Sequence, residues 1–247
     1  MKKLFLFIGC LIFITACQSA TATSQTEPTP QAATQTPPPP ATATLTFTPT
    51  PTLPPTPVPL FFTEEFNTDL GVWVSFQTGG AESPNVNLEN DLLRIDFSSP
   101  NTWYYAIHNA HEYTNVFVSA KFSGTPSGSI GVICDYSESN GWYEFNLASD
   151  GTYSVLFGQW LAEGIAQYTP IAIDTTEYLK AGNLDHEIGL TCQGNILLLH
   201  INGKLFRKLD VTRYGLTAGR IGINASSFDE TPAIAIFDWV TVNEPSQ

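Results

Sequence analysis

The chain of 247 residues has little positive charge, with 10 Lys and Arg against 23 Asp and Glu and a formal net charge of −13. Leaving Lys2 and Lys3 of the N-terminal leader out of the count changes that charge from −13 to −15. Such a surface has no basic stripe to neutralise phosphates, so we expect no nucleic acid partner. It also repels acidic polysaccharides and anionic lipids, whereas neutral sugars, cations and basic partners remain as ligands.

The N-terminal leader lacks an apolar run long enough to cross a bilayer. Its apolar stretch, Leu4–Ile14, follows two lysines. As a helix it would extend about 17 Å, well short of the roughly 30 Å hydrocarbon core of a bilayer. The pattern therefore predicts an export signal rather than a spanning helix.

This apolar run ends in Ile14-Thr15-Ala16-Cys17, which resembles the bacterial lipobox. The resemblance implies that residues 1–16 are a lipoprotein signal peptide and that Cys17 is lipidated after export. Acyl chains would then hold the protein to the outer face of a bacterial membrane, which becomes its first partner. The alternative is an ordinary cleaved signal with an unrelated cysteine.

The next segment is poor in charge and in large apolar side chains. Between residues 18 and 59 the only charged residue is Glu27, whereas the segment holds 12 of the 18 prolines and 13 threonines. It cannot bury enough apolar surface to offset the entropy lost on ordering, so we expect a disordered Pro/Thr-rich linker over 17–59. Its Thr-Pro units favour an extended spacer, and a proline-rich recognition peptide is the alternative.

Residues 60–247, here called the head, lack a convincing 3.6-residue apolar period but show many stretches of period two. Turn dipeptides suited to type I′ hairpins separate these stretches: Asn140-Gly141, Asp150-Gly151, Gly194-Asn195 and Asn202-Gly203. We predict an all-β head, an antiparallel two-sheet β-sandwich or jelly roll. The expected strands are 60–66, 72–77, 85–88, 92–98, 103–109, 114–123, 129–136, 142–148, 152–158, 186–193, 195–201, 204–210, 219–225 and 233–242.

Three parts of the head resemble a known superfamily. Its opening Phe61-Phe-Thr-Glu-Glu-Phe and its closing Ile236-Phe-Asp-Trp-Val-Thr-Val242 are similar to the first and last strands of concanavalin A-like lectin/glucanase domains. Its centre, from Gly131-Val-Ile-Cys-Asp-Tyr136 to Asn202-Gly203, resembles laminin G-like jelly rolls of bacterial surface proteins. These are structural motifs, so the resemblance implies the fold more strongly than a function.

The carboxylate pair that the glucanases of this superfamily use is not found in the sequence. Those enzymes carry Glu-x-Asp-x-(x)-Glu on one strand, because retaining chemistry needs two carboxylates about 5–5.5 Å apart. The nearest match, Glu89-Asn90-Asp91, continues as Leu92-Leu93-Arg94 without a second glutamate, and it is typical of a turn. We therefore expect a head that is not an enzyme, while a glycoside hydrolase with an unrecognised acid pair stays open.

Cysteines are few as well. Cys10 lies in the signal and Cys17 in the lipobox, which leaves Cys134 and Cys192 for the exported head. Pairing across Gly194-Asn195 sets Cys192 opposite Leu197, on the apolar face of its strand. Ile130, Val132, Cys134 and Tyr136 also share an apolar face, so both sulfurs should point into the sandwich. We predict a disulfide between them, the alternative being two buried free thiols.

Alternation also suggests a ligand-binding face. If Tyr143, Phe145 and Leu147 point into the core, then Trp142, Glu144 and Asn146 point the other way. An aromatic ring beside hydrogen-bonding groups is typical of sugar-binding faces, and Trp160 would add a second ring. The alternative is that Trp142 packs beneath a neighbouring loop.

The superfamily resemblance further implies a structural calcium ion. Asp238 lies where related sandwiches place an aspartate ligand, and Glu65 on the opening strand is a candidate helper. The alternative is an aspartate hydrogen-bonded at a strand edge.

Three functions are open to the head. The first is non-catalytic binding of an extracellular ligand, a neutral glycan, by a surface-anchored lipoprotein. The second is a structural or adhesive role in which the head contacts other envelope proteins, and the third is glycoside hydrolysis.

Overall fold

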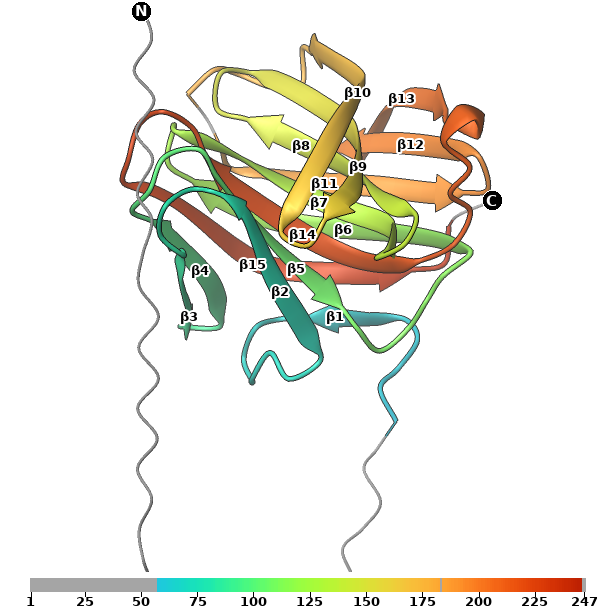
Figure 1. Cartoon of the computed structure of the whole chain (residues 1–247), viewed down its shortest axis with the longest axis horizontal. Coiled ribbons are helices and arrows are strands. Elements are labelled where there is room, and N and C mark those ends of the chain that lie inside the picture. Colours follow the sequence, from blue (N-terminus) through green and yellow to red (C-terminus); the bar gives the residue numbers. More distant parts are fainter. Residues whose placement is uncertain (1–56, 183, 246–247) are drawn as a thin grey trace, which may run out of the picture. The chain divides into compact units, whose positions relative to one another are not determined.

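The computed structural model describes residues 57–182 and 184–245, so that Cys17 and the segment 18–56 lie outside the described residues. The described residues form fifteen strands and a 3₁₀ helix, η1 (Thr212–Tyr214), arranged as two antiparallel sheets (Figure 1). None of the helices in this part of the chain is long and apolar enough to span a membrane. The expected antiparallel β-sandwich is thus confirmed.

One sheet has eight strands. Seven of them follow the order β13-β12-β11-β6-β15-β4-β3, and β1 pairs with β15 beyond the reach of β4. Their bounds are β1 (Phe62–Glu64), β3 (Asn85–Glu89), β4 (Leu92–Phe97), β6 (Asn115–Gly124), β11 (His186–Gln193), β12 (Ile196–Ile201), β13 (Lys204–Asp210) and β15 (Ala233–Asn243).

The other sheet has seven strands in the order β10-β9-β8-β7-β14-β5-β2. Their bounds are β2 (Trp73–Gly79), β5 (Thr102–His108), β7 (Gly128–Ser137), β8 (Gly141–Ala148), β9 (Thr152–Ala162), β10 (Ile165–Thr175) and β14 (Arg220–Ser227).

The main core lies between the two sheets. It is built from alternate residues of each strand, because a strand that is covered on one face points every second side chain inward. The contributing side chains are mostly aliphatic and fully buried, and they include Val118, Leu190, Leu199, Val132, Val155 and Ile223.

The predicted disulfide between Cys134 and Cys192 is confirmed. Cys134 lies on β7 and Cys192 on β11, so the bond joins the two sheets through the core, with the two Cα atoms 6.5 Å apart. The predicted pairing of the β11–β12 hairpin is confirmed as well, with Gln193 opposite Ile196 and Cys192 opposite Leu197.

The turns differ from the prediction in detail. Asn202 and Gly203 both have positive φ, as a type I′ turn requires. At the other three dipeptides only the glycine has positive φ, namely Gly141, Gly151 and Gly194, so these are not type I′ turns. Within the stretch Glu89-Asn90-Asp91, Asn90 and Asp91 form the expected turn between β3 and β4, and Glu89 is the last residue of β3.

Strand β10 is absent from the predicted strands. Its sequence contains Pro170, which lacks an N–H group and argues against a central strand. The structure accommodates this proline because β10 is an edge strand, and its register with β9 shifts between Pro170 and Ala172.

A bulge in β7 overturns one predicted face. Ile130, Val132 and Cys134 do point into the main core, but Tyr136 does not. The β7–β8 register shifts between Cys134 and Ser137, and Asp135 has a φ of 52°. This extra residue turns Tyr136 to the outer face of the seven-stranded sheet.

The seven-stranded sheet curls so far that its two edge strands meet. Six strand spacings of about 4.8 Å would place β2 and β10 roughly 29 Å apart in a flat sheet. Yet the Tyr168 hydroxyl of β10 lies 2.9 Å from the Thr78 hydroxyl of β2. Both strands are on the near side of the molecule in Figure 1. The outer face of this sheet is therefore enclosed by its own edges.

Candidate functional site

A second set of buried side chains fills the enclosed face, and we call it the aromatic cluster. It consists of the aromatic residues Phe76 (β2), Trp103 and Tyr105 (β5), Tyr136 (β7), Trp142 (β8), Trp160 (β9) and Tyr168 (β10), together with Ile107, Ile133 and Ala166. Of the rings, those of Tyr105, Tyr136 and Trp142 are buried and the others half-buried. Neighbouring rings are in contact: the centroids of Phe76 and Tyr105 are 4.6 Å apart, and those of Phe76 and Trp160 are 4.9 Å apart. A ring from β2, at one edge of the sheet, thus packs on a ring from β9, the strand next to the other edge.

Trp142, Glu144 and Asn146 point to this outer face, as alternation predicts, but they are not open to solvent. Their exposed fractions are 0%, 1% and 6%. The prediction of an open aromatic plate at Trp142 is therefore wrong. The reason is that β10 and the edge strand β2 fold over the face, which the alternation within β8 does not reveal.

Gly158 explains how Trp142 fits there. Gly158 is the β9 partner of Trp142, and a Cβ on it would lie 2.3 Å from Cε2 of the indole. Only a residue without a side chain leaves room for the ring to lie across β9 at this point.

Glu144 is the buried acid of the cluster. The indole N–H of Trp142 donates to one carboxylate oxygen at 3.0 Å, the amide of Asn224 donates to the same oxygen at 3.2 Å, and the amide of Asn146 donates to the other at 3.1 Å. Burial raises the pKa of the Glu144 carboxyl, and these hydrogen bonds work in the opposite direction. The network fixes the Trp142 ring.

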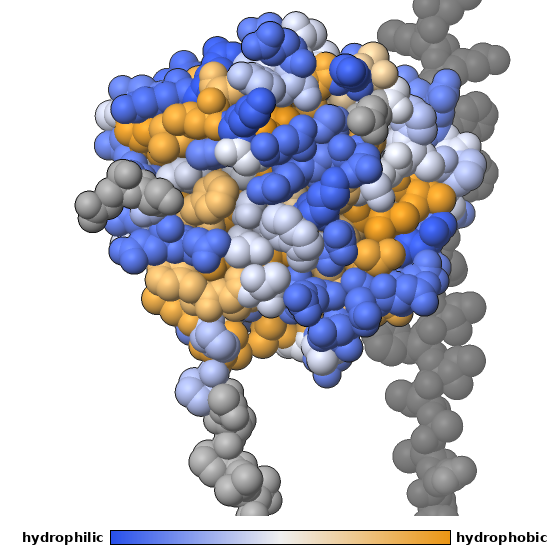
Figure 2. Space-filling model, turned by 180° about the vertical axis from the view of Figure 1, so that it is seen from behind, coloured by the Kyte–Doolittle hydropathy of each residue, from blue (hydrophilic) through white to orange (hydrophobic). Residues whose placement is uncertain are grey.

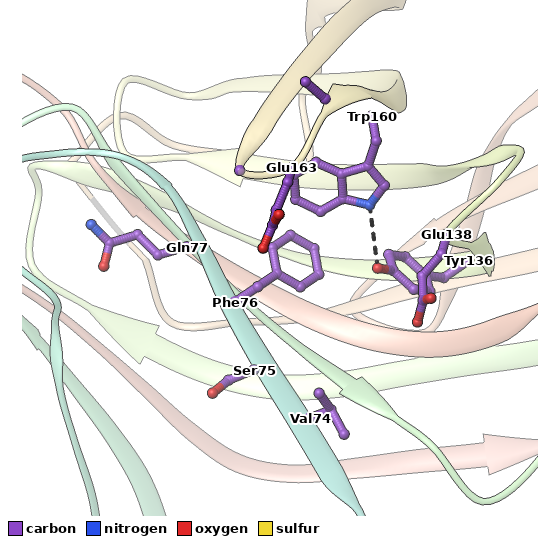
Figure 3. A pocket seen from close by; sticks show the side chains of 10 residues that line it. Val74, Ser75, Phe76, Gln77, Tyr136, Glu138, Trp160 and Glu163 are labelled. Atoms are coloured by element: carbon purple, nitrogen blue, oxygen red, sulfur yellow. Dashed lines mark hydrogen bonds between the residues drawn. The ribbon is translucent and has the colours of Figure 1, made fainter.

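One part of this face remains open, and we call it the aromatic pocket. Its volume is about 440 Å³, and it lies between β2, the end of β7 and the β9–β10 hairpin. Figure 3 shows the rings of Phe76, Trp160 and Tyr136 beside one another, with the Trp160 N–H directed at the Tyr136 hydroxyl, 3.4 Å away. The complete lining is Val74, Ser75, Phe76, Gln77, Tyr136, Glu138, Trp160, Ala162, Glu163 and Gly164.

Two carboxylates belong to the pocket lining and differ in their partners. Glu138 accepts a hydrogen bond from Arg220 at 3.1 Å, and the Arg220 guanidinium lies over the Tyr136 ring. Glu163, on the β9–β10 hairpin, has no side-chain hydrogen bond or ion pair with the residues that the structure describes. The pocket therefore combines aromatic surface with one paired and one unpaired acceptor group.

Of the four predicted ligand-binding residues, only Trp160 lines this pocket. Phe76, Tyr136 and Glu163 also line it but were not among the predicted ligand-binding residues. A signal for the enclosed face exists in β5, whose run Trp103-Tyr-Tyr-Ala-Ile107 is apolar on both faces, as in a strand buried on both sides.

The predicted calcium ligands lie near each other. Asp238 and Glu65 line one hollow of about 190 Å³, together with Asn67, Asp91 and Trp239. Within 57–182 and 184–245, no three His, Cys, Asp or Glu side chains gather closely enough to hold a metal ion. A calcium ion at this hollow would need backbone carbonyl ligands in addition, so it stays a prediction.

No protein-family model matches the chain, and no curated protein matches its sequence. Solved structures do match. A Bacillus licheniformis beta-glucanase has a TM-score of 0.53 and 15% identity over 75% of this chain and 98% of its own. A Bacillus subtilis protein of unknown function with a galectin-like fold has a TM-score of 0.54 and 13% identity, over 74% of this chain and 94% of its own. The carbohydrate binding module CBM66 from Bacillus subtilis has a TM-score of 0.51 and 13% identity, over 70% of this chain and 96% of its own.

At these identities the likeness shows the fold alone. That fold is the concanavalin A-like jelly roll, as the opening, central and closing motifs of the head imply.

Proposed function

We propose that the head is a non-catalytic carbohydrate-binding module and that it binds a neutral glycan in the aromatic pocket. The observation that carries this proposal is the solvent-open pocket lined by Trp160, Phe76 and Tyr136. Aromatic rings stack on the apolar C–H faces of sugars, and the carboxylates of Glu138 and Glu163 accept hydrogen bonds from sugar hydroxyls. The carbohydrate-binding and galectin-like proteins of the same fold support this reading.

The acidity of the pocket and of the chain favours a neutral glycan. The chain has a net charge of −13, and the unpaired Glu163 would repel a uronic or sialic acid at the pocket. Neutral sugars meet no such penalty.

The proposal is tested with the isolated, purified head on a glycan array and by affinity electrophoresis in gels that contain neutral polysaccharides. Trp160→Ala should weaken binding about ten-fold or more, because a loss of roughly 1.4 kcal/mol corresponds to a factor of ten. Trp239→Ala, which removes a half-buried tryptophan from the other sheet, is the matched control and should bind as the unaltered head does. Absence of binding to any neutral polysaccharide would contradict the proposal.

Glycoside hydrolysis is the less favoured candidate. Glu144 does not line the pocket and is covered by the aromatic cluster, and Glu138 is paired with Arg220. This leaves Glu163 without a second free carboxylate among the residues lining the pocket, whereas the hydrolases need two. This candidate would be revived if the unaltered head releases reducing sugar from a polysaccharide and if Glu138→Gln and Glu163→Gln each abolish that release.

An adhesive role has one observation in its favour. The outer face of the eight-stranded sheet has a hollow of about 240 Å³ lined by Phe117, Leu198, His200 and the exposed Leu205, with Thr191. Figure 2, seen from the side opposite to Figure 1, has several hydrophobic areas divided by hydrophilic ones. If this face contacts an envelope protein, a single stoichiometric partner should be captured by the head and lost in Leu205→Glu.

We also propose that the head is exported and lipid-anchored through Cys17. The support is the Lys2-Lys3 start, the apolar run and the lipobox-like Ile14-Thr15-Ala16-Cys17. Cys17→Ser in the full chain should release the protein from the membrane fraction or leave an uncleaved precursor. Unchanged detergent partitioning of that variant would contradict the anchor.

A further inference from the structure

The space on the enclosed face of the seven-stranded sheet between β2 and the β9–β10 hairpin, here called the groove, is closed by side-chain contacts beyond Val74. Three residues of β2 point into it in succession: Val74, Phe76 and Thr78, which pair with Ile107, Tyr105 and Trp103 of β5. Val74 lines the aromatic pocket and is 53% exposed. Phe76 and Thr78 meet side chains of β9 and β10 on the opposite side of the sheet.

Two contacts close the groove beyond Val74. The Phe76 ring packs edge-on against Trp160 at a centroid distance of 4.9 Å. One step further, the Thr78 hydroxyl lies 2.9 Å from the Tyr168 hydroxyl, which also accepts a hydrogen bond from Tyr105 at 2.9 Å. Strand β2 thus meets β9 at one level of the groove and the opposite edge strand, β10, at the next level.

A polymer that is bound by its interior needs a groove with two open ends, so that both continuations of the chain can leave. The aromatic pocket has a single open end, because its inner end is the wall formed by Phe76, Trp160 and Tyr136. The volume of the pocket, about 440 Å³, is at the lower end of the range for small-molecule sites. A pocket of this size suits a short segment of a glycan chain.

We propose that the aromatic pocket binds the terminal residue of a neutral glycan chain and not an internal stretch of it. The inference rests on the proposed function and specifies its ligand. The terminal ring enters beside Val74 and stacks against Trp160 or Phe76, and the rest of the glycan continues into solvent past the β9–β10 hairpin. Glu163 on that hairpin accepts a hydrogen bond from a hydroxyl of the terminal ring or of its neighbour.

The experiment measures how many heads bind one chain as the chain becomes longer. The probes are unbranched neutral polysaccharides, namely barley β-glucan, unsubstituted xylan, mannan and pullulan, each with size-fractionated oligosaccharides made from it by partial hydrolysis. For each probe that binds, isothermal titration calorimetry gives the stoichiometry and the Kd per chain. Terminal recognition predicts one head per unbranched chain at every length, with a Kd per chain that stays constant beyond the shortest oligosaccharide that binds.

The outcomes separate the two proposals. If the number of heads per unbranched chain grows with chain length, terminal recognition is overturned while glycan binding stands. If none of the probes binds, the proposed function fails and this inference fails with it.

Two variants address the closed end directly. Phe76→Ala/Tyr168→Ala removes one side chain from each of the two closing contacts and keeps Trp160, so heads per long chain should rise above one if these contacts block the groove. Tyr168→Phe keeps both rings and should leave the stoichiometry at one. The length series on the unaltered head decides the question even if the double variant does not fold.

Discussion

The head contains two sets of buried side chains that differ in composition and origin. The main core between the sheets is mostly aliphatic and is crossed by the Cys134–Cys192 disulfide. The aromatic cluster lies on the outer face of one sheet and encloses the acid Glu144. The first set arises from the alternation within each strand, whereas the second depends on the curl of a sheet whose edges meet. We infer that the main core holds the fold and that the aromatic cluster shapes the candidate site.

Removal of the disulfide should have the largest effect on stability, because the bond cross-links the two sheets through the main core. In Cys134→Ala/Cys192→Ala the free energy of unfolding should fall by about 4 kcal/mol, the chain-entropy value for a loop of this length. Urea unfolding of the head measures it, and the unaltered head unfolded with reductant serves as the control. Two alkylatable cysteines in the denatured head without reductant would show that the bond is absent.

Asp135 lies at the junction of the two sets, between Cys134 in the core and Tyr136 in the cluster. Burial raises the pKa of its carboxyl from 3.8 to about 7. The Asp135 carboxyl therefore binds its proton more tightly in the folded head than in the unfolded chain. The resulting stability is fully present below pH 3.8 and is lost as the pH rises through 7.

Asp135→Asn should remove this loss. Relative to the variant, the unaltered head should lose on the order of 3 kcal/mol of unfolding free energy between about pH 4 and pH 8. Burial lowers the pKa of His108 to about 4, but that contribution is common to both proteins and cancels in the comparison. If the unfolding free energies of the two proteins change with pH in parallel, the raised pKa of Asp135 is contradicted.

Gly158→Ala tests the aromatic cluster without touching the main core. The added Cβ would meet the Trp142 ring at 2.3 Å, so we expect a loss of about 2 kcal/mol and a change in the near-ultraviolet circular dichroism. Gly189→Ala is the matched control, since its Cβ meets the outer ring atoms of the half-buried Phe117 on the other sheet. Adding Trp142→Leu to Gly158→Ala should recover part of the loss. Equal effects of the two glycine variants would contradict a special role for Gly158.

Calcium should have the smallest effect, because its predicted ligands lie in neither set. If Asp238 and Glu65 help to hold the ion, added calcium should raise the Tm by roughly 2–4 °C, equivalent to about 1 kcal/mol for a domain of this size. EDTA should reverse the rise, and Asp238→Asn should not respond to either reagent. A Tm of the unaltered head that is indifferent to calcium and EDTA would remove this prediction.

Local alternation was enough to predict most strands of the sandwich, the β11–β12 register and the disulfide. These features depend on which face of a strand is apolar, and the sequence states this directly. The same reasoning failed for Tyr136, because a single bulged residue, Asp135, reverses the faces of the residues after it in β7. It also failed for β10, because Pro170 is compatible with an edge strand and alternation does not reveal edges.

The candidate site was harder to predict than the fold. Alternation placed Trp142 on the correct face of β8, but it carries no information about a strand that folds over this face from the far edge of the sheet. The pocket combines Phe76 on β2 with Trp160 on β9, two strands that lie far apart in the order of the sheet. Only the curl of the whole sheet brings them together.

Pro170 has a consequence beyond β10 itself. An edge strand exposes unpaired N–H and C=O groups on which a second molecule can add a strand, and proline or charged residues at an edge suppress such aggregation. Pro170 interrupts one edge of the seven-stranded sheet, and β13 at the edge of the eight-stranded sheet carries Lys204, Arg207 and Lys208. A chain with only 10 positive residues thus places three of them along one edge. Copies of the head at high concentration should therefore resist fusing into a continuous sheet.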